Sequence, residues 1–145
     1  MDAFDYSIDC ARRLKKMYSE YSKAVVDEGL RKFFSSMGEQ EVSHIRFLKE
    51  KKREHAAHKA TMQRAEEVTK ELGDPPPEKE VASMDKLDFL SHAAEMEEQT
   101  MNLYKKVLDC CNDNSEFSSI FKSLYDEEKR HLALVKDRYD LESLM

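Results

Sequence analysis

The chain has 145 residues, a length that suits one domain with a buried core. Its formal net charge is −6, and acidic and basic residues are mixed along it, so a nucleic-acid-binding surface is not indicated. It contains no run of about 18 apolar residues and no apolar N-terminal signal, and its three cysteines suggest no disulfide framework, so we expect a cytoplasmic protein without a membrane segment.

Glycine and proline are scarce, with three of each, which favours long helices and few turns. We expect four main helices, each with an apolar stripe at helical spacing, over about residues 5–26, 30–50, 85–111 and 116–139. The chain breaks at Asp27–Gly29, and Ser83 or Asp85 could cap the third helix. A long polar stretch over 49–84 separates the second helix from the third.

The lengths of these connections predict the topology. Short links within each half of the chain, and a long link between the halves, describe two helical hairpins joined by a crossover over 49–84. The expected fold is therefore an all-α four-helix bundle, formed by residues 1–145 as a single domain.

The second and fourth predicted helices repeat each other at an offset of 87 residues, which places Glu41 on Glu128 and His44 on His131. Because residues three apart share a helix face, each Glu-x-x-His pair lies on one face, and both pairs continue the apolar stripes. Carboxylates and imidazoles that point into a core need partners there. A pair of metal ions would satisfy all four side chains.

The Glu-x-x-His spacing alone is weak evidence, because glutamate is common in this chain. The shared register within a repeat, on the buried stripe, is what indicates a metal site. The alternative is that the four side chains are joined to one another by hydrogen bonds and protons, in a bundle that no longer binds metal.

With these motifs the chain resembles the ferritin-like superfamily, and most closely the small rubrerythrin-type di-iron carboxylate proteins. The resemblance covers the four predicted helices, which is most of the chain outside Lys49–Met84. In that family each half contributes one carboxylate from its first helix and a Glu-x-x-His pair from its second. The resemblance thus implies that Glu41 and Glu128 are bridging carboxylates and that Glu97, seven residues before Tyr104, is a terminal carboxylate. It also implies that His44 and His131 each supply one imidazole, one per metal.

One ligand of the family pattern is missing from the first half. Seven residues before Tyr18, where the repeat and the family both require Glu, the sequence has Ala11. Asp9 and Glu20 are about 200° and about 180° away around the helix, so we expect them to point elsewhere. With this gap the site could hold two unequal metal ions, a single ion, or none.

The resemblance implies two iron ions as the cofactor, with manganese or zinc as alternatives, and an oxidoreductase that reduces peroxide or oxygen or oxidises Fe(II). No Cys-x-x-Cys pair of a rubredoxin domain is present, so a separate electron donor would be required. The resemblance also implies a homodimer, for which Tyr21, Phe47 and Phe89 are candidate exposed contacts. The alternative function is iron handling or protein–protein interaction without turnover.

Other polar and aromatic residues have ordinary structural interpretations. His55 and His58 follow a charged run, so we expect them on an exposed helix face. We expect His92 at the surface or in an interface. Tyr18 and Tyr104 are expected in the core, each with its hydroxyl satisfied by a nearby carboxylate.

Overall fold

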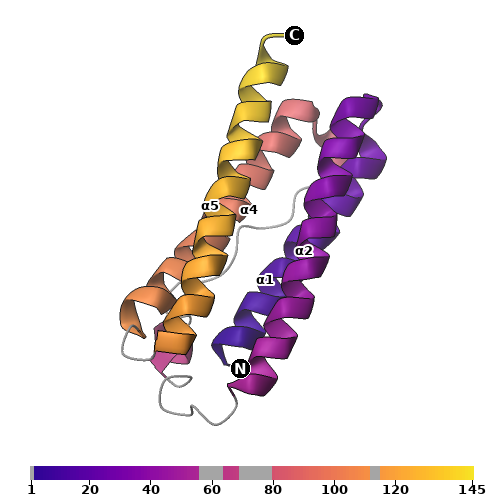
Figure 1. Cartoon of the computed structure of the whole chain (residues 1–145). Helices are drawn as coiled ribbons and strands as arrows, with labels where there is room; N and C mark the ends of the chain where they lie inside the picture. Colours follow the sequence, from indigo (N-terminus) through magenta and orange to yellow (C-terminus); the bar gives the residue numbers. More distant parts are fainter. Residues whose placement is uncertain (1, 56–63, 69–79, 112–114) are drawn as a thin grey trace.

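The computed structural model describes residues 2–55, 64–68, 80–111 and 115–145. Four long helices run side by side along the molecule (Figure 1): α1 (Ala3–Ala24), α2 (Glu28–Glu54), α4 (Lys86–Cys110) and α5 (Ser115–Ser143). A short 3₁₀ turn, η1 (Val81–Ser83), precedes α4, and residues 64–68 are also helical. The described ranges contain no β-strand.

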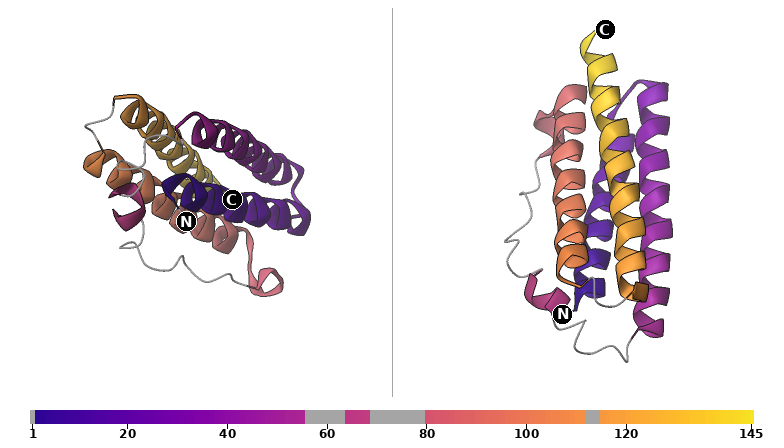
Figure 2. Two further views of the ribbon diagram at one scale, coloured as in Figure 1. Left: turned by 90° about the horizontal axis from the view of Figure 1, so that it is seen from below. Right: turned by 60° about the vertical axis from the view of Figure 1, so that its left-hand side comes forward.

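The helices form two hairpins, as predicted. α1 packs along α2, α4 packs along α5, and α1 also contacts α4. The right-hand view of Figure 2 shows the four helices nearly parallel. α2 ends at the lower end of the bundle in Figure 1 and α4 begins at the upper end, so the end of the first hairpin and the start of the second lie at opposite ends of the bundle. The prediction of an all-α bundle of two hairpins is confirmed.

Within the part of the chain that the structure describes, no helix has an apolar stretch that could span a membrane.

Aspartate side chains fix where three of the helices begin. α1 starts two residues before the predicted position, because the Asp5 backbone N–H donates to Asp2 Oδ1 over 2.9 Å. α2 likewise starts two residues early, at Glu28, because Leu30 N–H donates to Asp27 Oδ1 over 2.7 Å. Asp85 caps α4 as predicted. Each cap satisfies a backbone donor that the first helical turn leaves without a partner.

α5 extends four residues beyond its predicted end, to Ser143. Its last turn is held by Glu142, which is buried and accepts a hydrogen bond from Arg138 Nε at 3.0 Å. Lys86 Nζ, at the start of α4, donates to the same carboxylate over 3.0 Å. These ion pairs join the final turn of α5 to α4.

Two apolar clusters fill the bundle, one toward each end. One is built around the aromatic rings of Phe4, Phe117 and Phe121, and the other around those of Tyr21, Phe34 and Phe89. Six buried polar side chains fall between the two clusters in the register of their helices: Glu41 and His44 on α2, Glu97 and Thr100 on α4, and Glu128 and His131 on α5. This arrangement encloses the predicted site in the middle of the bundle.

Two of the residues proposed for a dimer interface belong to the core instead. Tyr21 and Phe89 are 2% and 3% exposed, and their ring centroids are 4.5 Å apart. Phe47 is partly buried against the other apolar cluster. The expectation of exposed contacts at Tyr21 and Phe89 was wrong, because both residues lie on the inward stripes of their helices.

Two histidines expected at the surface are buried. His55 is 5% exposed and its ring stacks on that of Phe4, with 6.4 Å between the centroids. His92 is 3% exposed, and its Nδ1 lies 2.6 Å from the hydroxyl of Tyr21. His92 is three residues from Phe89 and so shares its inward face, which explains the error. His58 lies outside the described residues.

Candidate metal centre

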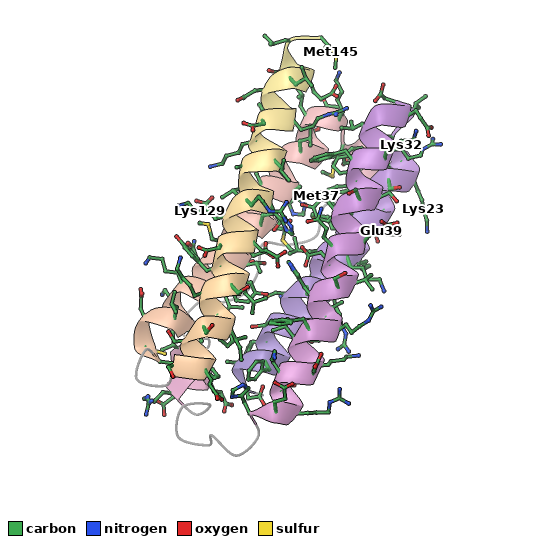
Figure 3. All side chains as sticks on the ribbon, viewed as in Figure 1. Lys23, Lys32, Met37, Glu39, Lys129 and Met145 are labelled. Carbon is green, nitrogen blue, oxygen red and sulfur yellow. The ribbon has the colours of Figure 1, made fainter. Side chains whose placement is uncertain are left out.

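The five predicted ligands are all buried and come from three helices. Glu41 and His44 lie on α2, Glu97 on α4, and Glu128 and His131 on α5. None of the five is more than 5% exposed. Glu41 lies one helical turn after Met37 on α2 and Glu128 directly precedes Lys129 on α5, and Met37 and Lys129 are labelled in Figure 3. The structure thus brings together all five residues that were predicted from the sequence as metal ligands.

Both imidazoles turn Nδ1 toward the same two carboxylates. His44 Nδ1 lies 3.4 Å from Glu41 Oε2 and 3.4 Å from Glu128 Oε1. His131 Nδ1 lies 3.6 Å from Glu41 Oε1 and 3.8 Å from Glu128 Oε1. It is also 4.0 Å from Glu97 Oε2. Glu41 and Glu128 each therefore lie within 3.8 Å of Nδ1 of both imidazoles.

The inward-facing atoms of the cluster make no hydrogen bonds with the described residues. They are both carboxylate oxygens of Glu41 and Glu128, Oε2 of Glu97, and Nδ1 of His44 and His131. Their mutual contacts of 3.4–4.0 Å exceed the 2.7–3.2 Å range of good hydrogen bonds. A buried polar atom without a partner costs about 1–3 kcal/mol. So many at one point indicate a cluster shaped to bind a cation.

The donor set is richer on the His131 side than on the His44 side. One ligand atom each from Glu41, Glu97, Glu128 and His131 can be chosen so that all lie within 4.8 Å of one another. Carboxylate oxygens with an imidazole nitrogen suit iron, manganese or zinc. His44 is not a member of this group. These four side chains could hold a metal ion, and His44 lies beside them, with Nδ1 3.4 Å from both Glu41 Oε2 and Glu128 Oε1.

Position 11, where the expected carboxylate is missing, faces the interior of the bundle as the repeat predicts. Ala11 is fully buried, so the position faces the interior, where a carboxylate would be required for a symmetric site. Asp9 lies 3.8 Å from Arg12 on the outside of α1, and Glu20 is exposed. Neither replaces the missing ligand, as expected from the helical phase.

The outward nitrogen of each imidazole has a partner that sequence reasoning missed. His44 Nε2 lies 2.7 Å from Glu127 Oε2, and His131 Nε2 makes a short contact with Gln40 Oε1. These contacts join α2 to α5 from both sides. A signal was present in the sequence, because Gln40 and Glu127 are equivalent positions of the 87-residue repeat, each directly before a predicted ligand.

Tyr18 supports Glu97, the carboxylate predicted to be a terminal ligand. Its hydroxyl donates to Glu97 Oε1 over 2.7 Å, which confirms the expectation for this tyrosine. The second tyrosine behaves differently. The hydroxyl of Tyr104 is buried and has no hydrogen-bond partner among the described residues, so that expectation was wrong. Glu97 is thus oriented from α1, across the hairpin boundary.

The electrostatics of the cluster favour a bound positive charge. Burial and the charge of Glu128 raise the pKa of Glu97 well above its usual range. Burial alone would lower the pKa of His44, but its contacts with Glu128 and Glu41 raise the pKa to about 11. Burial raises the pKa of Glu128, yet its contacts with Glu97 and His44 hold the net pKa below the usual value. Without a metal ion, the surroundings of Glu97 and His44 therefore favour the protonated form of each.

One of three comparisons with known proteins gave a match. A search of curated proteins and a search of solved structures both gave no match. A family model described as Rubrerythrin matches residues 12–139, which begin directly after Ala11 and include all five buried ligand candidates. That match covers most of the chain, so the protein belongs to the rubrerythrin family.

Proposed function

We propose that the chain binds two metal ions, iron in the first instance, and uses them to reduce peroxide or oxygen or to oxidise Fe(II). The single observation that carries this proposal is a set of seven inward-facing nitrogen and oxygen atoms on α2, α4 and α5, which have no hydrogen-bond partner among the described residues. Membership of a family of di-iron carboxylate proteins supports iron as the metal. Manganese and zinc accept the same ligand types and remain alternatives.

The chain supplies an environment suited to that chemistry. With Fe(II) bound by these residues, the pair would supply the two electrons that one peroxide needs, together with two protons, to become two waters. Tyr18 holds Glu97 through its 2.7 Å hydrogen bond, and the apolar clusters on either side keep bulk water from the centre. Glu41 and Glu128 reach both imidazoles and can hold two ions together.

The second candidate function is metal binding without turnover, in iron handling or protein–protein interaction. The observation that favours it is the buried Ala11 at a ligand position, which leaves the His44 side short of a carboxylate. A bundle held by hydrogen bonds in place of metal has less support. The inward contacts of His44 and His131 are 3.4 Å or longer, whereas such a network would shorten them.

We also infer the setting and partners of this function. The thiols of Cys10, Cys110 and Cys111 form no disulfides, in keeping with a cytoplasmic protein. With no rubredoxin-type Cys-x-x-Cys pair in the chain, electrons would come from a separate donor. A homodimer is the proposed assembly, although its contacts are not the buried Tyr21 and Phe89.

The test is one addition of peroxide to anaerobically Fe(II)-loaded, desalted protein, with the near-ultraviolet spectrum recorded. A rapid absorbance rise supports the oxidoreductase. Two bound irons without a spectral change support metal binding without turnover. Glu98→Gln is the matched control for Glu97→Gln, because Glu98 is the adjacent but exposed carboxylate. Only the Glu97 variant should lose the response.

A further inference from the structure

The outer contacts of the two imidazoles are reciprocal but differ in charge. Gln40 on α2 approaches His131 on α5, and Glu127 on α5 approaches His44 on α2. Both residues directly precede a bridging carboxylate, at equivalent positions of the repeat. The same geometry therefore places a neutral amide behind one imidazole and a carboxylate behind the other.

Both contacts set the ring so that Nδ1 is available to a cation. An imidazole that binds a metal ion through one nitrogen carries its proton on the other and donates it to an acceptor. Glu127 Oε2 accepts that proton from His44, and Gln40 Oε1 accepts it from His131. Only the acceptor behind His44 adds negative charge.

The position of that charge matches the position of the missing ligand. Two divalent ions carry four positive charges, and the buried carboxylates of Glu41, Glu97 and Glu128 supply three negative ones. Glu97 serves the His131 side, whose outer acceptor is neutral. The His44 side has Ala11 in front, and Glu127 behind. Glu127 brings the number of carboxylates around the centre to four.

We propose that Glu127 compensates for Ala11, by supplying from behind His44 the negative charge that the first half of the site lacks in front. Glu127 is thus a positioning residue that lets the His44 side hold the second ion. This inference rests on the proposed metal-binding function. The two halves of the site then differ in where the carboxylate lies. On the His131 side Glu97 reaches the ion directly, and on the His44 side Glu127 lies behind the imidazole.

Two surrounding features limit the size of the effect. The side chain of Glu127 is 44% exposed, so water screens part of its charge. Arg130 Nη2 lies 3.7 Å from Glu127 Oε1 and 3.5 Å from Gln40 Oε1, but the arginine side chain is 55% exposed. Outer partners of metal-bound histidine typically change metal affinity about 10- to 100-fold. We therefore expect an effect near the lower end, about tenfold.

The test is an anaerobic titration with Co(II) alone, followed through its visible absorption, in four chains. These are the wild type, Glu127→Gln, Ala11→Glu and the double variant. Glu127→Gln keeps the size and the hydrogen-bond acceptor and removes only the charge. In the chain with Ala11, this substitution should lower the affinity for the second Co(II) ion about tenfold and leave the affinity for the first ion unchanged. With Glu at position 11, the same change should cost less than about threefold, because the direct carboxylate makes Glu127 redundant.

A swap variant tests the same proposal if Ala11→Glu does not fold. Gln40→Glu combined with Glu127→Gln moves the charge from behind His44 to behind His131. The affinity for the second Co(II) ion should fall, and the affinity for the first should rise. Circular dichroism of each metal-free variant checks that the bundle is intact.

The outcomes separate this proposal from the function on which it rests. A wild type that binds no Co(II) overturns both. A wild type that binds one ion overturns the role of Glu127 but leaves metal binding in place. Equal losses on Glu127→Gln in both backgrounds would mean that the residue only orients the imidazole, and would also overturn the proposal.

Discussion

The imidazole rings of His44 and His131 lie nearly parallel, with 16° between their planes and 5.4 Å between their centroids. They come from different hairpins, and both direct Nδ1 toward Glu41 and Glu128. The internal repeat of the sequence has thus become an approximate twofold arrangement in space. The arrangement is broken at Ala11, which has no carboxylate to match Glu97.

Removal of the His131 imidazole and removal of the His44 imidazole should reduce metal binding to different extents. His131 belongs to the four-donor group and His44 does not, so His131→Ala should lose more bound metal than His44→Ala. Metal content per chain after desalting measures this difference. Equal losses in the two variants would mean that the halves are equivalent despite Ala11.

Restoring the missing carboxylate should make folding more dependent on metal. Ala11 is fully buried, so Ala11→Glu in metal-free protein should lower the free energy of unfolding by about 1–3 kcal/mol. Added metal should recover this loss, because binding to the folded state alone stabilises it. Thermal unfolding with and without Mn(II) provides the measurement. Ala11→Gln, which matches the size but not the charge, should gain much less from metal.

The stability of the metal-free protein should fall as pH rises above 6.5. The contacts of His44 with Glu128 and Glu41 outweigh its burial and raise its pKa from 6.5 to about 11, so the folded state binds the proton more tightly than the unfolded state. That contribution is complete below pH 6.5 and is lost as pH rises toward 11. Each pH unit within this window should cost about 1.4 kcal/mol.

Urea unfolding in the presence of a chelator, at pH 6.5, 7.5 and 8.5, would measure this slope. The raised pKa of Glu97 acts in the same direction, since its protonated form is also favoured by folding. The variant His44→Gln should flatten the dependence. A free energy of unfolding that is constant or rises across this range would contradict the electrostatics described for the cluster.

The two buried tyrosines should respond differently to loss of the hydroxyl. Tyr18→Phe removes the donor to Glu97 Oε1, and leaves a buried carboxylate oxygen without its partner. We expect a loss of about 1–3 kcal/mol in the free energy of unfolding. Tyr104→Phe removes a hydroxyl that has no partner among the described residues, and should cost little. Urea unfolding of both variants tests this, and equal costs would contradict the assigned hydrogen bond.

Much of the centre could be predicted because the repeat encodes it. The 87-residue offset identified Glu41, His44, Glu128 and His131 without any knowledge of their distances. Glu97 required the family pattern, because no Glu occupies the matching position in the first half. These five positions lie on apolar stripes, where a polar residue is informative.

The outer partners could not be predicted because they lie at the edge of those stripes. Glu127 is half-exposed, and a glutamate on a charged helix is usually a solvated residue. Only the approach of α5 to α2 shows that it reaches His44. His92 was misplaced for a related reason, since a lone histidine gives no sign of burial until its phase is compared with that of Phe89. Helix ends depended on single side chains such as Glu142.

Metal content per chain tests the central claim most directly. Protein loaded anaerobically with Fe(II) and desalted should contain about two irons by elemental analysis, and Glu41→Gln combined with Glu128→Gln should abolish binding. A chelator should lower the thermal stability of the loaded wild type. A chain that retains no iron, and whose unfolding temperature is the same with and without chelator, would contradict the assignment of the buried cluster as a metal centre.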